Sequence, residues 1–287
     1  MIALAGNSSS QFFVNGRKRK FTKHVRIFYS DYVINMAKTM ETKPTRRFIF
    51  SRIQEILLQP RRTFGLIAEE TQSSWLTPML VLSISAFLSV IVSGYLTSRA
   101  AMMGEVALPP DWQYWTPDMQ NNYMQAQQAM QGPVFSYIIP LFSALVALWL
   151  GWLLLSGLLH LGSTLLGGRG SMQGALNIVG WASLPFLIRD VLRIIFMLFA
   201  GHSIASPGLS GFAGDAAFWN QILSRVDVFL VWNCILLVIG FGFSENLSKG
   251  RVIGGVVAVV VLILVVNAGM GALLSGVGGL AVQRPFF

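Results

Sequence analysis

The sequence predicts an all-α, polytopic membrane protein, built as a bundle of five transmembrane helices with an N-terminal interfacial amphipathic helix. Three observations support this fold class. Of the 287 residues, 54% are hydrophobic and only 11% are charged, and the mean hydropathy is +0.60. Five apolar segments are each long enough, at about 20 residues, to cross a hydrocarbon core of about 30 Å. This composition excludes a disordered chain and argues against an ordinary soluble enzyme.

The positive charge is concentrated at the N-terminal end. Residues 1–74 contain thirteen lysines and arginines but only five acidic residues, and they carry almost all of the formal net charge of +9. We predict that residues 1–45 form a basic, disordered cytoplasmic extension. It shows no apolar run followed by a small-residue cleavage site, so a secretory signal is not expected. Basic segments beside membrane helices are typical of topology signals and of contact with anionic lipid headgroups, which we expect here rather than binding to nucleic acid.

Residues 46–74 are predicted to form an amphipathic segment at the membrane interface. Ile49, Ile53 and Ile56 recur at helical spacing, and Pro60 ends the helix. Two interpretations stay open, a surface helix lying among lipid headgroups and a linker helix packed against the bundle. Five basic residues of this segment are predicted to contact headgroups: Arg46, Arg47, Arg52, Arg61 and Arg62.

Residues 75–280 are predicted to form the five-helix transmembrane domain. The predicted spans cover 76–98, 134–160, 175–200, 226–244 and 252–276. An odd number of spans places the two termini on opposite sides of the bilayer. The connection at 99–133 has a net negative charge, whereas those at 161–174 and 245–251 are net positive. Because cytoplasmic connections carry the excess of lysine and arginine, we expect the N-terminus in the cytoplasm and the C-terminus outside.

The third predicted span contains three charged residues, Arg189, Asp190 and Arg193. Arg189 and Arg193 share a helix face, and Asp190 is placed to pair with Arg193 three residues later. An uncompensated charge at the bilayer centre costs about 2.5–3.5 kcal/mol, so these side chains should face the interior, with Asp227 of the fourth span as a further partner. One interpretation is an ion-pair lock between the third and fourth helices. The alternative is an intramembrane anion-binding site in a transporter or channel component, although the sequence shows no convincing inverted repeat.

No motif specifies a catalytic, cofactor-binding or metal-binding site. The string at 208–211, Gly-Leu-Ser-Gly, matches the Gly-x-Ser-Gly pattern of rhomboid intramembrane proteases, but all three histidines precede Ser210, so a downstream base is missing. His160 has no ligand partner at metal-binding spacing, and the string Gly-Gly-Arg-Gly at 167–170 lacks the ending of a phosphate loop. The single Cys234 excludes an internal disulfide. We therefore predict a protein that is not an enzyme and that uses no cofactor or metal.

Small and polar residues inside the spans are predicted to join helices. Ala147 and Gly151 lie four residues apart in the second span, a spacing that lets helix backbones approach closely. The approach could be within one bundle or between two copies, so a homo-oligomer stays open. Asn177, Asn233 and Asn267 are predicted to form interhelical hydrogen bonds.

Several strings together resemble the Ypt-interacting protein (Yip) domain family, in its bacterial branch. They are Ile53-x-x-Ile56-Leu57-Leu58-Gln59-Pro60-Arg61-Arg62-Thr63-Phe64, then Trp75 and Pro78, Ala-Ser-Leu-Pro at 182–185, and Asp-Val-Phe-Leu-Val-Trp-Asn-Cys-Ile-Leu-Leu at 227–237. The resemblance covers residues of about 50 to 270. It implies a five-helix membrane bundle with a cytoplasmic N-terminus and without catalytic residues, and its eukaryotic members bind Rab-type GTPases and shape or sort membranes.

Together these observations predict a non-enzymatic scaffold or accessory subunit of a membrane complex, associated with trafficking or export through the family resemblance. The expected partners are the lipid bilayer, anionic headgroups and other membrane proteins. The expected location is the bacterial inner membrane.

Overall fold

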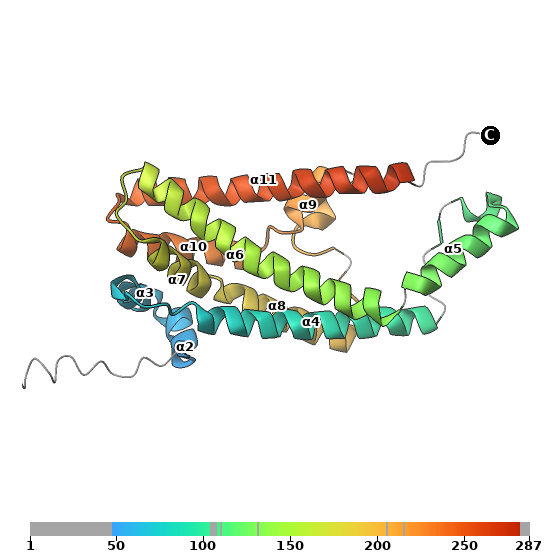
Figure 1. Ribbon diagram of the computed structural model, residues 1–287, viewed down its shortest axis with the longest axis horizontal. Helices are drawn as coiled ribbons and strands as arrows, with labels where there is room; N and C mark the ends of the chain where they lie inside the picture. The colour runs from blue at the N-terminus through green and yellow to red at the C-terminus, as the bar shows by residue number, and fades with distance from the viewer. Residues whose placement is uncertain are drawn as a thin grey trace, which may run out of the picture. The chain divides into compact units, whose positions relative to one another are not determined.

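The computed structural model describes residues 48–103, 108–109, 111–130, 132–204, 206–214 and 216–281. In these ranges every regular element is helical, as the composition predicts. Figure 1 shows the long helices lying side by side, with shorter helices packed among them. The predicted basic extension at 1–45, together with Arg46 and Arg47, falls outside the described residues.

The predicted amphipathic segment consists of two short helices, α2 (Ser51–Leu58) and α3 (Pro60–Glu69). The break falls at Gln59, because Pro60 lacks an amide hydrogen and is therefore accommodated in the first turn of a new helix. Ile56 of α2 and both Phe64 and Ile67 of α3 are fully buried. Since α3 packs against α7 and α10, this apolar face lies on the bundle, as the linker interpretation predicts.

Within the described ranges, three continuous helices are long and apolar enough to cross a membrane. They are α4 (Leu76–Met102), α6 (Ile139–Leu165), which continues a π-helical turn η2 (Val134–Ile138), and α11 (Lys249–Ala281). Their candidate spans cover Leu76–Ala100, Val134–Leu165 and Lys249–Leu273. They coincide with the first, second and fifth predicted spans.

The third predicted span, 175–200, is not one helix. It is divided at Ser183 into α7 (Met172–Ala182) and α8 (Leu184–Ala200). Pro185 stands at the start of α8, where its missing amide hydrogen interrupts the hydrogen bonding that a continuous helix would need. Most residues of α7 are buried, so this helix lies inside the bundle. Many residues of α8 are exposed.

The fourth predicted span is also interrupted. A short helix α9 (Ala217–Leu223) meets α10 (Val228–Ser244) at an angle of 60°, and only the two together are long enough to cross a membrane. Asp227 begins α10, where its carboxylate Oδ1 accepts a hydrogen bond of 2.8 Å from the amide of Leu230. Over the described ranges the structure therefore holds three continuous candidate spans, or four if the bent pair counts as one.

Five helices form a closed ring of contacts in the order α4, α8, α10, α11 and α6, and α6 packs back against α4. At one end, α7 packs against α6, α10 and α3. The core there is made of buried apolar side chains, among them Trp181, Phe64, Ile178 and Leu237. Gly240 allows α10 to lie close to its neighbours, because a Cβ at this position would collide with the side chain of Ile178.

The remaining elements are short and lie in the connections. The chain between α4 and α6 contains η1 (Trp112–Tyr114) and the polar helix α5 (Pro117–Met130), which lies to one side of the long helices in Figure 1. Between α8 and α9, η3 (Ser210–Phe212) packs against α9, which in turn packs against α11. These connections hold the bend between α9 and α10 in place.

Candidate functional site

The charge cluster predicted from the sequence forms where α8 meets the start of α10. Asp227 Oδ2 lies 3.7 Å from Arg189 Nη1 and 3.8 Å from Arg193 Nη2. The same carboxylate also caps α10 through Leu230. One aspartate therefore holds two arginines of α8 and fixes the beginning of the next helix.

The second carboxylate of the cluster links α8 to α4. Asp190 Oδ1 lies 3.4 Å from Arg189 Nε, and Asp190 Oδ2 accepts a hydrogen bond of 3.1 Å from Ser85 Oγ of α4. Spacing along the helix predicted that Asp190 would pair with Arg193. Instead, Asp190 pairs with Arg189, and Arg193 is held by Asp227.

The cluster is electrically balanced but not tightly bonded. Its two guanidinium groups face two carboxylates, and the four side chains retain between 12% and 31% of their exposure. The separations of 3.4 to 3.8 Å exceed the 2.7–2.9 Å of strong charge-assisted hydrogen bonds. A free anion at this site would have to compete with both carboxylates, so the geometry favours the ion-pair lock over an anion site.

A cavity of about 340 Å³ lies inside the ring of helices beside this cluster. It reaches Arg189 and Asp190, and it is also lined by Arg225, Asn233 and Asn267. Most of its remaining wall is apolar and comes from α4, α6 and α11. Sequence reasoning missed both the cavity and Arg225, because Arg225 lies in the bend before α10 and reads as an ordinary charge flanking a span.

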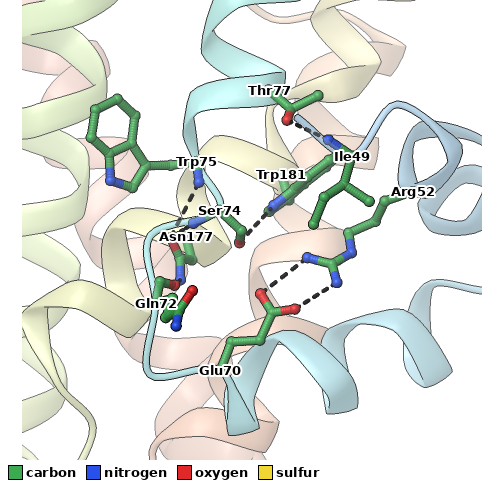
Figure 2. Close-up of polar contacts among 9 residues, drawn as sticks. All are labelled: Ile49, Arg52, Glu70, Gln72, Ser74, Trp75, Thr77, Asn177 and Trp181. Carbon is green, nitrogen blue, oxygen red and sulfur yellow. Dashed lines mark hydrogen bonds and ion pairs between the residues drawn. The ribbon is translucent and has the colours of Figure 1, made fainter. Parts of the chain in front are cut away.

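A second polar cluster fixes the N-terminal pair, α2 and α3, to α7 (Figure 2). The side-chain amide of Asn177 in α7 forms hydrogen bonds with backbone groups of the segment that leads into α4. Its Oδ1 accepts hydrogen bonds from the amides of Ser74, at 2.9 Å, and Trp75, at 3.3 Å, and its Nδ2 donates to the carbonyl of Gln72 at 2.9 Å. Asn177 is fully buried, and its bond to the amide of Ser74 is buried as well, whereas its bonds to Trp75 and Gln72 are partly buried.

Arg52 is part of the same cluster. Its guanidinium donates two hydrogen bonds to the carboxylate of Glu70, at 2.5 and 3.0 Å, and lies 5.5 Å from the centre of the Trp181 ring. Only 11% of the Arg52 side chain is exposed. An internal carboxylate and an aromatic face therefore occupy the Arg52 guanidinium, and its predicted headgroup contact stays a prediction. Arg61 and Arg62 are both exposed, and for them headgroup contact stays a prediction.

Trp181 and Thr77 complete the connection. The indole Nε1 of Trp181 donates to Ser74 Oγ at 3.1 Å, and Thr77 Oγ1 accepts from the amide of Ile49 at 3.0 Å. Trp75 packs against Trp152 of α6 in a tilted arrangement, with 4.7 Å between ring centres. The strings that carry the family resemblance, around 53–64 and at 75, thus contact one buried helix.

A buried carboxylate joins the two turns at this end of the bundle. Glu245, only 1% exposed, accepts a hydrogen bond of 2.9 Å at Oε2 from the amide of Gly170. A Cβ at Gly168 or Gly170 would collide with that carboxylate. The glycine-rich string at 167–170 is therefore a turn, as predicted, and its glycines make room for Glu245, a residue that sequence reasoning did not single out.

Two further features bear on the serine of the protease-like string and on metal binding. Ser210 is buried, and its hydroxyl donates to the carbonyl of Pro207 at 2.8 Å. Among the residues that the structure describes, no three histidine, cysteine, aspartate or glutamate side chains gather in a group that could hold a metal ion.

Comparison with family models identifies the chain. The model of the Yip1 domain matches residues 55–270, three quarters of the sequence, from α2 to the last part of α11. The chain belongs to the Yip1 domain family. With its apolar helices, this Yip1 domain protein is a multi-pass membrane protein with transmembrane helices. The resemblance seen in the sequence is confirmed, and the bacterial branch stays a prediction.

Neither the comparison with curated proteins nor the comparison with solved structures gave a match.

Proposed function

We propose that this Yip1 domain protein is a non-enzymatic scaffold or accessory subunit of a membrane complex that works in trafficking or export. The family match supports membrane trafficking as the general setting. The main support for a non-transporting role is that the charges inside the bundle pair with one another. Arg189 and Arg193 are both held by Asp227, so this cluster joins helices.

The proposed membrane arrangement keeps five crossings, with α7 and α8 together as a broken third crossing. From Met172 to Ala200 this pair contains enough residues to cross a hydrocarbon core of about 30 Å, even with the break at Ser183. The N-terminus then lies in the cytoplasm and the C-terminus outside, and the proposed membrane is the bacterial inner membrane.

Labelling with a membrane-impermeant thiol reagent tests this arrangement. In a Cys234→Ser background, Arg169→Cys and Ser203→Cys place single thiols before α7 and after α8. Five crossings predict that the reagent reaches position 203 from outside intact cells, and position 169 only after the membrane is opened. Equal labelling of both positions in intact cells would contradict a third crossing.

The scaffold proposal also predicts specific neighbours in the membrane. Gentle solubilisation followed by quantitative mass spectrometry is expected to recover the chain with particular membrane proteins at fixed ratios. A matched sample of an unrelated five-span protein of similar abundance is the control. Recovery of the chain alone, or with the same proteins as the control, would contradict the scaffold role.

The exposed face of α2 and α3 is the proposed contact with anionic headgroups. Leu58 and Leu66 keep 70% and 49% of their exposure, and Arg61 and Arg62 are exposed between them. An apolar residue on each side of two cations is typical of helices at a membrane surface.

The second candidate function is a transporter or channel component that binds an anion at Arg189, Asp190, Arg193 and Asp227. The observation in its favour is the cavity of about 340 Å³, which reaches Arg189 and Asp190. It predicts anion flux that depends on Arg193, whereas the scaffold proposal predicts none.

A further inference from the structure

We propose that the cavity inside the helix ring binds one anionic phospholipid, with the phosphate at Arg225 and an acyl chain along the apolar wall. The cavity borders the charge cluster at Arg189 and Asp190, but the proposed phosphate contact is Arg225, which is not one of the paired charges. The proposal gives the cavity a ligand that is neither transported nor chemically changed.

The wall of the cavity suits a hydrocarbon chain. Apolar side chains from three helices line it: Met79, Leu82, Leu148, Leu155, Ile263 and Leu264. Its volume of about 340 Å³ lies at the lower end of the range, roughly 300–1,000 Å³, that is typical of small-molecule sites. An apolar cavity that holds a few convergent polar groups at one part of its wall is typical of such sites.

A ligand is expected to enter the cavity past α6. Ala147 and Gly151 line the cavity from α6, and both are exposed and carry little or no side chain. Of the three continuous candidate spans, α6 is the least buried, with 6% of its apolar window inside the structure against 28% for α4 and 22% for α11. A ligand that enters past these two small residues therefore comes from the lipid phase.

Arg225 is the cation available to a ligand. Arg189 and Arg193 lie within 4 Å of carboxylates, whereas Arg225 has no carboxylate partner among the residues that the structure describes. It lines the cavity and is exposed. With three arginines against Asp190 and Asp227, this end of the cavity carries an excess positive charge, which favours a ligand with one negative charge.

The turn at 207–210 fixes the bend that carries Arg225. The amide of Leu209 donates to the carbonyl of Leu223 at 2.8 Å. Gly208 has φ +62° and lies against the carbonyls of Leu223, Ser224 and Val226, where a Cβ would approach within 2.7 to 2.9 Å. The string that resembles a protease motif thus packs against the backbone on both sides of Arg225, so the bend that carries this residue is in place before a ligand arrives.

Two pairs of variants test the site, each with a matched control. Gly151→Leu fills the opening, and Gly157→Leu makes the same change on α6 away from the cavity; a Cβ at either glycine meets nothing within 4 Å. Arg225→Gln removes the free cation, and Arg99→Gln removes another exposed arginine that does not line the cavity. The full-length protein is delipidated in detergent and titrated with phosphatidylglycerol, and native mass spectrometry counts the bound lipid.

The wild-type protein is expected to bind one phosphatidylglycerol tightly. Gly151→Leu and Arg225→Gln are expected to weaken that binding roughly tenfold or more, while both controls stay within about twofold of the wild type. A parallel titration with inorganic phosphate separates the two sources of a phosphate group, and phosphate is expected not to displace the lipid.

Equal affinity for phosphatidylglycerol in Gly151→Leu and Gly157→Leu would overturn the proposal. Displacement of the lipid by inorganic phosphate would overturn it as well, because the ligand would then be a free anion. The thermal unfolding midpoint of each variant is measured without lipid, and the phosphate titration on the wild type decides the question if a variant does not fold.

Discussion

Two regions of the bundle use buried polar groups in different ways. Around Asn177, which is fully buried, three hydrogen bonds of 2.9 to 3.3 Å pair its side chain with backbone groups. Around Asp227, charged side chains sit 3.7 to 3.8 Å apart, retain part of their exposure and border a cavity. The first region fixes the fold, whereas the second joins helices loosely enough to leave room for a ligand.

Replacing Asn177 with leucine should have the largest effect on stability. The change leaves the amides of Ser74 and Trp75 and the carbonyl of Gln72 without this partner. An unpaired group costs about 1–3 kcal/mol where water cannot reach it, so the loss should be about 3 kcal/mol. Thermal unfolding in detergent measures it. The control is Asn267→Leu, because Asn267 donates only to the carbonyl of Ile263 within its own helix, and its loss should be much smaller. Similar losses in the two variants would remove the proposed difference between the regions.

Gly170→Ala should rank second. The added Cβ would collide with the buried carboxylate of Glu245, and overpacking of this kind typically costs about 1–3 kcal/mol. At Gly157, in the middle of α6, a Cβ meets nothing within 4 Å, so Gly157→Ala should be neutral or stabilising by up to about 1 kcal/mol. Gly170→Ala should therefore lower the unfolding midpoint, whereas Gly157→Ala should leave it unchanged or raise it.

Asp227→Asn tests the looser region. Asparagine still caps α10, so the helix start is kept, and only the charge that holds Arg189 and Arg193 is lost. Because the side chains are partly exposed, the expected loss is roughly 1–2 kcal/mol rather than the larger value of a fully buried pair. Asp118→Asn, in the exposed helix α5, is the charge-matched control and should change the unfolding midpoint little.

Arg52→Lys should have the smallest effect, on the order of 1 kcal/mol. Lysine keeps the charge but loses the two-pronged contact with Glu70 and the planar contact with Trp181. Arg61→Lys is the control, since Arg61 is exposed and should tolerate the change. Equal unfolding midpoints for both variants would show that the contacts of Arg52 with Glu70 and Trp181 do not stabilise the fold.

The long helices could be predicted from the sequence because each is a continuous apolar run. In α4, α6 and α11 no proline or charge interrupts the middle of the run, so length alone identifies the span. The division of 175–200 into α7 and α8 could not be predicted in this way. Pro185 is compatible with a kinked span as well as with a new helix, and the packing of α7 against α3, α6 and α10 decides between them.

The candidate site was predictable in part. Charged residues inside an apolar segment need partners, and this requirement predicts that four side chains lie together: Arg189, Asp190, Arg193 and Asp227. Their exact pairing depends on the position of α10 relative to α8, which spacing along one helix does not give. Glu245 and Gly170 are 75 residues apart, and nothing in either local sequence indicates the contact.

Anion flux in liposomes distinguishes intramembrane charges that join helices from charges that bind a transported anion. Wild-type protein and Arg193→Leu are reconstituted at equal density, and their flux is compared with protein-free liposomes while unfolding midpoints are measured in parallel. If the charges join helices, neither sample shows flux above the protein-free level, and Arg193→Leu has a lower folding yield or unfolding midpoint. Flux in the wild type that is lost in a fully folded Arg193→Leu protein would contradict a helix-joining role.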